Sequence, residues 1–535
     1  MTRSHFLQQL DDVHHAWDVI VIGGGATGLG TAVESAGRGY RTLLLERNDF
    51  ASGTSSRSTK LVHGGVRYLR QGNLVLVMEA LKERGILLRN APHLVHDIPF
   101  VVPLYDWWEG PFYGAGLTLY DVLAGRLGME PSRHLTREEM HLLFPTISDK
   151  GLRGGIMYHD GQFDDARLAV SLARTLVDLG GAPLNYCAAT NLIKANGLTT
   201  GVEATDLESG KSFRLQSRVV INATGVFADG IRKLDDSSVP AVVTPSQGIH
   251  LVVARSFLPG NTAIMVPHTD DGRVLFAIPW HDRVLIGTTD TPVSDISQEP
   301  CPGREEIDFL LEHTGRYLVS PPERKDILSI FAGLRPLVGK NNKGETSTFS
   351  RDHQVLVSRS GLVTITGGKW TTYRLMAQDT VDQAALVGGL ASHPSNSVHQ
   401  RIHGWREAPA EDPLGVYGSD AEQLQEMASA IPSGMERMHP DLPYLVCEAV
   451  WAVRHEFART VMDVLARRTR ALFLDAAASI AMAPRVAGLI AAELGRDESW
   501  QQRQIEEFRA LARTYLPMES SIPPAPSTPS KRMLA

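Results

Sequence analysis

The stretch VIVIGGGATG, residues 19–28, decides the fold class of this chain. It begins with a short, continuous apolar run closed by glycines, which is typical of a strand buried on both faces of a parallel sheet. The small and apolar residues of Ala26–Arg38 predict a helix that ends before Gly39, and Thr42–Leu45 predicts the next strand. Together these segments predict one strand-helix-strand unit of an α/β domain.

The glycines of this stretch follow the spacing G-x-G-x-x-G at Gly23, Gly25 and Gly28. Glycine lets the backbone come close to a pyrophosphate, and the start of the following helix offers N–H groups and a partial positive charge to that anion. Glu46 follows the second strand, where a carboxylate can accept hydrogen bonds from ribose hydroxyls. The pattern predicts a dinucleotide site, although by itself it does not separate FAD from NAD.

Two later strands also end in glycine turns. Residues 219–222 lead into Ala223-Thr224-Gly225, and residues 362–366 lead into Gly367-Gly368. Turns that converge on the same cofactor favour FAD, because an NAD site has less need of them. The turns are far apart in the sequence, so we expect a discontinuous FAD-binding domain made of residues 15–90, 150–235 and 340–390.

The rest of the chain predicts two further domains. Strand-like runs alternate with turn residues between 248 and 290, which indicates a mainly antiparallel substrate-binding or cap domain, residues 91–149 and 236–339. Helical patterns dominate residues 400–520, and the proline-rich end at 521–535 predicts a disordered tail. The expected fold class therefore combines α/β and α+β parts: a Rossmann-like FAD-binding domain, an antiparallel domain and a C-terminal helical domain.

The composition is that of a globular protein, with 43% hydrophobic and 21% charged residues among 535. The net charge of -7 argues against nucleic acid as a partner, because a phosphate backbone needs a basic surface. We find no stretch of about 18 apolar residues, so a membrane span is not expected. The three cysteines, Cys187, Cys301 and Cys447, are too far apart for a disulfide framework, and no metal site is predicted.

Motifs beyond the glycine turn resemble those of FAD-dependent glycerol-3-phosphate dehydrogenases of the aerobic, quinone-linked type. The longest is FASGTSSRSTKLVHGGVRYL at residues 50–69. Shorter motifs follow in that family's order: IPW (278–280), GTTD (287–290), GLRP (333–336), SRDH (350–353) and GGKWTTYR (367–374). The resemblance covers roughly residues 15–500.

This resemblance implies oxidation of sn-glycerol 3-phosphate at C2 to dihydroxyacetone phosphate, with the electrons passing through FAD to a membrane quinone. It also implies a cytoplasmic protein in peripheral contact with the inner face of the cytoplasmic membrane, and it allows a homodimer. One alternative is an oxidase of the same family that reduces oxygen. A less favoured alternative is an amine or amino-acid oxidase of the same fold, which would need a carboxylate clamp and an apolar cage. An inactive flavin-binding regulator is a third.

The resemblance also assigns cofactor contacts outside the glycine turn. The serine-rich part of the long motif is expected to contact the flavin, and the helix start after Gly367 is expected to face the flavin edge that becomes negative on reduction. The residues so assigned are Thr54, Ser55, Ser58, Lys60, Gly368 and Thr371.

A phosphomonoester substrate needs positive charge. Guanidinium groups match its oxygen atoms with paired hydrogen bonds. The predicted cradle consists of Arg67, Tyr68, Arg335, Arg351 and Lys369.

Oxidation of a secondary alcohol also needs a base for the hydroxyl proton. His63 is the first choice, and His250 is a second candidate that also belongs to the predicted substrate site. The predicted catalytic residues are therefore His63, Arg335 and Lys369. Gln247 stands where some relatives have a basic residue, which leaves its part in substrate binding open.

The segment Trp107–Tyr120 is unusually rich in aromatic residues. Such a segment fits either a corner of the hydrophobic core or the boundary between a membrane and water. The sequence slightly favours the core.

Overall fold

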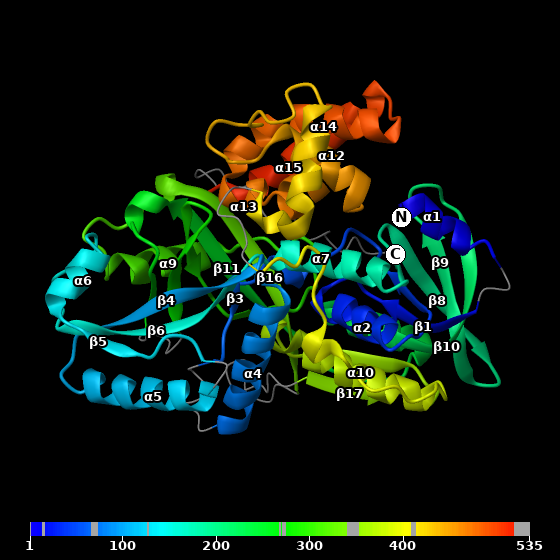
Figure 1. The fold of residues 1–535 in the computed structure, drawn as a ribbon, viewed down its shortest axis with the longest axis horizontal. Coiled ribbons are helices and arrows are strands. Elements are labelled where there is room, and N and C mark those ends of the chain that lie inside the picture. Colours follow the sequence, from blue (N-terminus) through cyan, green and yellow to red (C-terminus); the bar gives the residue numbers. More distant parts are fainter. Residues whose placement is uncertain are drawn as a thin grey trace, which may run out of the picture.

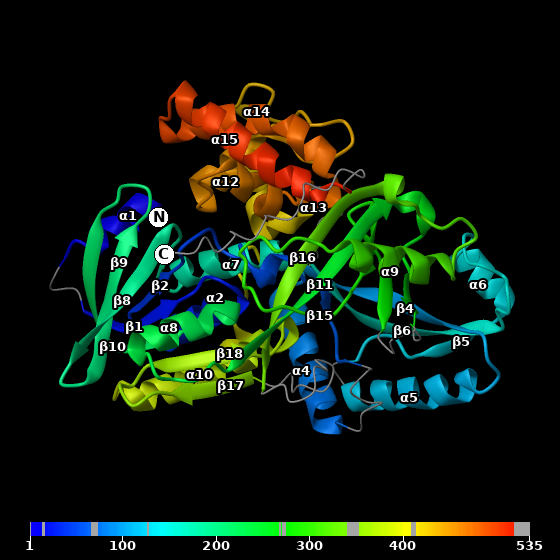
Figure 2. The same ribbon diagram turned by 180° about the vertical axis from the view of Figure 1, so that it is seen from behind.

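The computed structural model describes residues 2–12, 16–65, 73–125, 128–266, 269, 274–339, 353–407 and 414–517. Figure 1 shows two sheets side by side with a group of C-terminal helices above them, and Figure 2 shows the same parts from behind. The predicted tail at 521–535 lies outside the described residues.

The first sheet contains the strand that the sequence placed at its centre. Its strand order is β17-β18-β10-β1-β2-β7, parallel except at the β17 edge, and the β8-β9 hairpin extends it through β10. β1 lies inside the sheet because it pairs with β10 and β2 at once, and five of its six residues are buried. The strands are β1 (Trp17–Ile22), β2 (Thr42–Leu45), β7 (Ala182–Leu184), β8 (Cys187–Ala195), β9 (Leu198–Asp206), β10 (Ser212–Asn222), β17 (His353–Val357) and β18 (Val363–Gly367).

Helices α2 (Ala26–Gly37), α7 (Asp165–Asp178) and α10 (Tyr373–Val387) pack on this sheet, with α2 in contact with the other two. The predicted helices after the first strand and after Gly367-Gly368 are therefore confirmed. Two smaller helices, α1 (Arg3–Gln9) and α8 (Ala228–Asp235), complete this part of the molecule.

The second sheet is mainly antiparallel, as predicted, with the order β15-β11-β14-β13-β12-β4-β6-β3; β16 pairs with β11 and β5 with β6. Only β12 and β4 run parallel among its pairs in the described ranges. The strands are β3 (Leu61–Val62), β4 (Val95–Leu104), β5 (Arg133–Leu135), β6 (Gly154–Phe163), β11 (Val243–Ala254), β12 (Ala263–Val266), β13 (Leu275–Trp280), β14 (Arg283–Gly287), β15 (Thr291–Pro292) and β16 (Ile327–Val338).

The structure places β3 and β6 in this second sheet, whereas the sequence analysis assigned residues 15–90 and 150–235 to the FAD-binding domain. β6 pairs with β4 along its whole length, from Val95↔Phe163 to Leu104↔Gly154. β3 pairs in turn with β6. β6 carries His159, Asp160 and Gln162 among its apolar residues, so its sequence has no pattern that assigns it to one sheet, and its register with β4 decides.

Four helices accompany the second sheet: α4 (Leu74–Asn90), α5 (Glu109–Ala124), α6 (Arg137–Leu143) and α9 (Arg304–Gly315). α5 runs along the lower edge of the molecule in both views, and α4 contacts it and runs upward at a steep angle to it (Figures 1 and 2).

The C-terminal part is helical, as predicted, and is built from α11 (Ala421–Ser429), α12 (Val446–His455), α13 (Ala471–Leu474), α14 (Ala476–Leu494) and α15 (Glu498–Ala512). Among the described residues, α14 is the one helix long and apolar enough to cross a membrane, with a mean hydropathy of 1.4, although the sequence analysis expected no such segment. It packs against α12 and α15, so its apolar composition serves the core of the helical domain.

Buried ion pairs join the helical domain to the rest of the molecule. Arg467 and Arg468 both bind the carboxylate of Asp49, which follows β2. Arg167 on α7 donates two hydrogen bonds, of 2.8 and 2.7 Å, to the carboxylate of Glu456. Removing one partner of such a pair leaves a buried charge uncompensated, so these contacts fix the domain's position.

Candidate functional site

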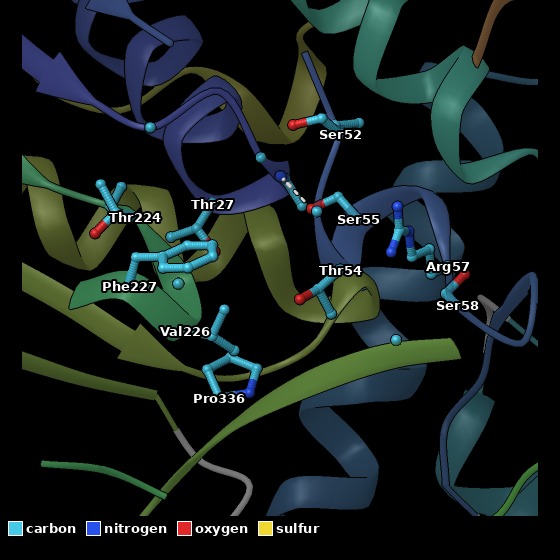
Figure 3. Close-up of a pocket in the computed structure, with 18 of the residues that line it drawn as sticks. Thr27, Ser52, Thr54, Ser55, Arg57, Ser58, Thr224, Val226, Phe227 and Pro336 are labelled. Atoms are coloured by element: carbon cyan, nitrogen blue, oxygen red, sulfur yellow. Dashed lines mark hydrogen bonds between the residues drawn. The ribbon is translucent and has the colours of Figure 1, made fainter. Parts of the chain in front are cut away.

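A cavity of about 720 Å³ lies between the two sheets. The carboxyl ends of β1, β2, β10 and β18 form one side of it, and β11 and β16 form the other. Figure 3 looks into the cavity, and its labelled wall residues come from distant parts of the chain, such as Thr27, Ser55, Thr224 and Pro336. Ligand sites of α/β proteins lie at this end of the parallel strands.

The glycine turn has the geometry that a bound pyrophosphate requires. Gly23 has φ +111°, and a Cβ there would lie 2.6 Å from the carbonyl oxygen of Ala223. Gly25 is the N-cap of α2 and provides no side-chain cap, while the amide of Ala26 donates to Ser55 Oγ at 2.9 Å, the dashed bond in Figure 3. The first turn of α2 thus opens into the cavity as an anion site.

Gly28 has a different role from the other two glycines. It does not line the cavity, and a Cβ at this position would lie 1.8 Å from the carbonyl oxygen of Gly23. The third glycine therefore allows helix and turn to pack closely, and its effect on a cofactor is indirect.

The Glu46 carboxylate lines the cavity beside the turn. It accepts hydrogen bonds from the amides of Gly24, at 2.6 Å, and Asn48, at 2.7 Å. Burial raises the pKa of Glu46, and the two amide hydrogen bonds oppose this effect. The two bonds fix the carboxylate at the place where a ribose would lie.

The serine-rich loop forms the next part of the wall. Thr54 Oγ1 donates to the carbonyl of Leu334 at 2.6 Å, and the indole of Trp370 donates to the carbonyl of Ser55 at 2.9 Å. Ser58 donates to Asp165 through both its amide and its hydroxyl. Thr54, Ser55 and Ser58 all line the cavity.

Lys60 lies behind this loop and does not line the cavity, contrary to its predicted role as a cofactor contact. Its Nζ is fully buried and donates to Asp165 Oδ2 and to the carbonyl of Ser56, both at 2.7 Å. Burial lowers the pKa of Lys60 to about 7, against the opposing effect of the Asp165 carboxylate. The lysine supports the loop from its inner side.

Gly367 and Gly368, with φ +80° and +76°, turn the chain from β18 into the segment that begins α10. Gly368, Lys369 and Thr371 line the cavity there, together with Ala223 and Gly225 at the end of β10. The Thr371 hydroxyl lies 3.4 Å from the carbonyl oxygen of His63.

His63, His250, Arg335 and Lys369 all line the same cavity, although they come from four distant segments. Arg335 on β16 donates to Asp290 Oδ1 at 3.2 Å, Thr288 Oγ1 at 3.0 Å and the carbonyl of Thr289 at 2.9 Å.

Arg67, Tyr68 and Arg351 were predicted for the same substrate site. They lie outside the described residues, so their assignments stay predictions.

His250 is buried on β11, where its ring stacks on Phe331 with centroids 4.9 Å apart and its Nε2 lies 2.9 Å from Thr59 Oγ1. Burial, with smaller contributions from the charges of Lys60 and Arg335, lowers the pKa of His250 well below its ordinary value of 6.5. The ring therefore stays neutral across the physiological range.

Some wall residues were not predicted. Arg57 is 4% exposed, pairs with Glu299 at 2.6 Å and donates to the carbonyl of Gln298 at 3.1 Å. Arg57 belongs to the motif at residues 50–69, so that motif could have been used to predict Arg57 as a wall residue. Arg467 reaches the cavity from the helical domain, and nothing in its local sequence indicates that.

Gln247 does not line the cavity. Its amide donates to Glu306 Oε2 at 2.8 Å and to the carbonyl of Cys301 at 3.1 Å, so it holds the loop before α9. Within the described ranges, no group of three or more His, Cys, Asp or Glu side chains is arranged to hold a metal ion.

Comparison with known proteins gives matches over nearly the whole chain. Residues 18–374 match the family described as FAD dependent oxidoreductase, and residues 362–501 match the C-terminal domain of alpha-glycerophosphate oxidase. The mitochondrial glycerol-3-phosphate dehydrogenase of Bos taurus is 39% identical over 529 residues, which cover 92% of this chain and 72% of that protein. The Arabidopsis thaliana enzyme is also 39% identical, over 93% of this chain and 86% of its own length.

Solved structures agree with these matches. The glycerol-3-phosphate dehydrogenase of Bacillus halodurans, solved in complex with FAD, superposes with a TM-score of 0.80 at 28% identity and covers 97% of this chain and 99% of its own. The L-alpha-glycerophosphate oxidase of Mycoplasma pneumoniae, with a TM-score of 0.51 at 17% identity over 72% of this chain and 98% of its own, shares the fold.

Proposed function

Because the chain belongs to the FAD-dependent glycerol-3-phosphate dehydrogenases, we propose that it oxidises sn-glycerol 3-phosphate at C2 and passes the electrons to a membrane quinone. One observation carries the proposal: a single cavity joins the glycine turn to His63, His250, Arg335 and Lys369. Bound FAD supplies the two-electron oxidation by accepting the C2 hydrogen as hydride.

The charges at the substrate end of the cavity suit a phosphate group. Arg335 and Lys369 both reach this wall, and Asp290 with the carbonyl of Thr289 fixes the orientation of the Arg335 guanidinium. A guanidinium that is already held in one orientation brings its positive charge to a phosphate group at a small entropic cost. Arg335 is therefore the proposed phosphate ligand among the described residues.

We assign the base to His63 rather than His250. A base works best when its pKa lies near the working pH. Burial puts the pKa of His250 well below that range, and its Nε2 is already bonded to Thr59. His63 lines the cavity close to the start of α10, so it is placed to take the proton of the C2 hydroxyl.

The peripheral membrane contact is proposed for the surface of α5 and its neighbour α4. The predicted aromatic segment is divided. Tyr113, Leu117 and Tyr120 are buried in the hydrophobic core, as the sequence slightly favoured, whereas Trp107 is 77% exposed. The exposed apolar residues of this surface are Leu74, Val75, Met78, Trp107, Trp108, Phe112, Leu119 and Val122.

No charged side chain lies on the exposed side of α5. The two acidic residues of this helix are turned inward: Glu109 is buried and accepts from the amide of Tyr105, and Asp121 accepts from the amide of Ser132. A helix with an apolar, uncharged outer side suits the boundary of a lipid bilayer, with Trp and Phe in the interfacial layer. We place this boundary at the inner face of the cytoplasmic membrane.

An anaerobic titration tests the reaction. We expect glycerol 3-phosphate to bleach the flavin absorbance of the purified holoenzyme, because the substrate reduces FAD. An enzyme whose flavin stays oxidised would contradict the proposed reaction.

Adding either a short-chain quinone or oxygen to the reduced enzyme identifies the electron acceptor. The oxidase alternative is supported by the match of residues 362–501 to an oxidase domain. Fast reoxidation by the quinone and slow reoxidation by oxygen is the expected outcome, and the reverse order would favour the oxidase.

A further inference from the structure

We propose that the buried hydroxyl of Tyr120 is a positioning group for the reaction, because it holds the turn that carries His63. This inference rests on the proposed function, since it concerns the base of that reaction. Tyr120 lies on α5, on the side opposite the exposed apolar residues, and is 1% exposed.

A chain of buried hydrogen bonds runs from α4 to the His63 turn. Arg84 Nη1 on α4 donates to Asp160 Oδ1 on β6 at 2.8 Å. The Tyr120 hydroxyl donates to the other oxygen of Asp160, also at 2.8 Å, and accepts from the amide of Gly64 at 2.8 Å. All three side chains are at most 2% exposed, so water does not compete for these bonds.

The Gly64 amide depends on this hydroxyl because the strand before it is short. β3 ends at Val62, so the chain has already left the sheet when it reaches His63 and Gly64. A buried N–H without a partner costs free energy comparable to a lost hydrogen bond. The contact is also close: a Cβ on Gly64 would lie 2.4 Å from the Tyr120 hydroxyl oxygen.

The direction of the chain of bonds is fixed. Burial, reinforced by the Asp160 charge, raises the pKa of Tyr120 well above its ordinary value of 10, so the phenol keeps its proton. The phenol donates this proton in a hydrogen bond to Asp160, and a lone pair of the phenol oxygen accepts the hydrogen bond from the Gly64 amide. Only in this arrangement can the phenol donate to Asp160 and accept from Gly64 at the same time.

The segment that carries His63 has to be held in place because His63 lines the cavity. His63 lines the wall, and its carbonyl meets Thr371 at the start of the segment expected beside the flavin. Displacement of a catalytic group by about 1 Å can cost about 100-fold in rate. A hydroxyl that fixes the neighbouring amide therefore affects the reaction without touching the substrate.

The variant Tyr120→Phe removes the hydroxyl and keeps the ring. We expect FAD to stay bound and the anaerobic rate of flavin reduction at saturating glycerol 3-phosphate to fall at least about tenfold. Tyr158→Phe is the matched control, because Tyr158 is 2% exposed, its ring lies 6.4 Å from that of Tyr120, and its hydroxyl donates to Met265 Sδ at 3.5 Å and not to Asp160. It should reduce its flavin at the wild-type rate.

The same change in a His63→Ala background separates positioning from general destabilisation. If Tyr120 acts through His63, the double variant should be hardly slower than His63→Ala alone. Equal losses in Tyr120→Phe and Tyr158→Phe, no loss in Tyr120→Phe, or a full further loss in the double variant would each overturn the inference. If the substrate does not reduce the flavin of the wild-type enzyme, the proposed function fails as well. If it does, and one of the outcomes above is found, only the role of Tyr120 fails.

Discussion

Arg335 is the residue on which the proposed phosphate recognition depends. Three hydrogen bonds, to Asp290, Thr288 and the carbonyl of Thr289, hold its guanidinium in one orientation at the cavity wall. A lysine would keep the charge and lose the planar guanidinium that these three hydrogen bonds orient.

We therefore expect Arg335→Lys to raise the KM for glycerol 3-phosphate about 10- to 100-fold, as expected for losing a hydrogen bond to a charged group. Steady-state kinetics with a soluble electron acceptor measures this. Arg324→Lys is the control, because Arg324 pairs with Asp308 away from the cavity wall. An unchanged KM in Arg335→Lys would remove the arginine from the phosphate site.

The residue scale also explains why neighbouring positions of one motif serve different purposes. Thr54, Ser55 and Ser58 line the cavity, whereas Lys60 turns inward to Asp165. The motif predicted a loop at the cofactor site, and the loop does line the cavity. It did not indicate which side chain points to the ligand and which supports the backbone.

At the scale of the element, α5 has two unlike sides. Its inner side carries Tyr120 and the bond to Gly64, and its outer side is apolar and uncharged. The exposed residues Trp108, Phe112, Leu119 and Val122 are four, seven and three positions apart, which places them along one side of the helix.

Placing a charge in this surface should weaken lipid binding. We expect Phe112→Glu to lower the partitioning of the holoenzyme onto phosphatidylethanolamine–phosphatidylglycerol vesicles at least about tenfold, since an apolar side chain of this size contributes about 1.5 to 3 kcal/mol when buried. Sedimentation with the vesicles measures the bound fraction. Leu142→Glu on α6, where Leu142 is 82% exposed, is the control and should bind as the wild type does. Equal binding by Phe112→Glu would exclude α5 as the contact.

At the scale of the whole molecule, charged contacts join parts that are far apart in the sequence. His403 lies between Asp178 at the end of α7 and Asp420 just before α11, with ring nitrogens 2.6 and 2.9 Å from their oxygens. Burial opposes a charge on this ring, but the hydrogen bonds to both carboxylates are stronger in sum and raise the pKa of His403 above 6.5.

This shift gives a pH dependence with a definite sign. A raised folded-state pKa adds stability that is fully present below the unfolded value of 6.5 and is lost as the pH rises through the folded value. We expect His403→Gln to lower the apparent Tm by about 2 °C or more near pH 6 and by clearly less near pH 9. Thermal scans of both proteins at the two pH values measure the difference. A deficit that is equal at both, or larger at high pH, would contradict the charged bridge.

The sequence alone determined the parts of this protein that depend on local pattern. The apolar run with its glycines at 19–28 predicted the buried strand, the turn and the helix, because each follows from residues a few positions apart. The resemblance of the motifs at 50–69 and 367–374 to one family predicted that both segments belong to the cofactor site, and residues of both line the cavity. Family membership also followed from these linear motifs.

Only the tertiary structure decided which distant residues meet. β6 could have been buried in either sheet, and its pairing with β4 placed it in the second. The arrival of Arg467 at the cavity and the contact between Tyr120 and Gly64 join segments with no common local signal. The physical reason is that burial and buried hydrogen bonds depend on the partner across the fold, which no stretch of sequence contains by itself.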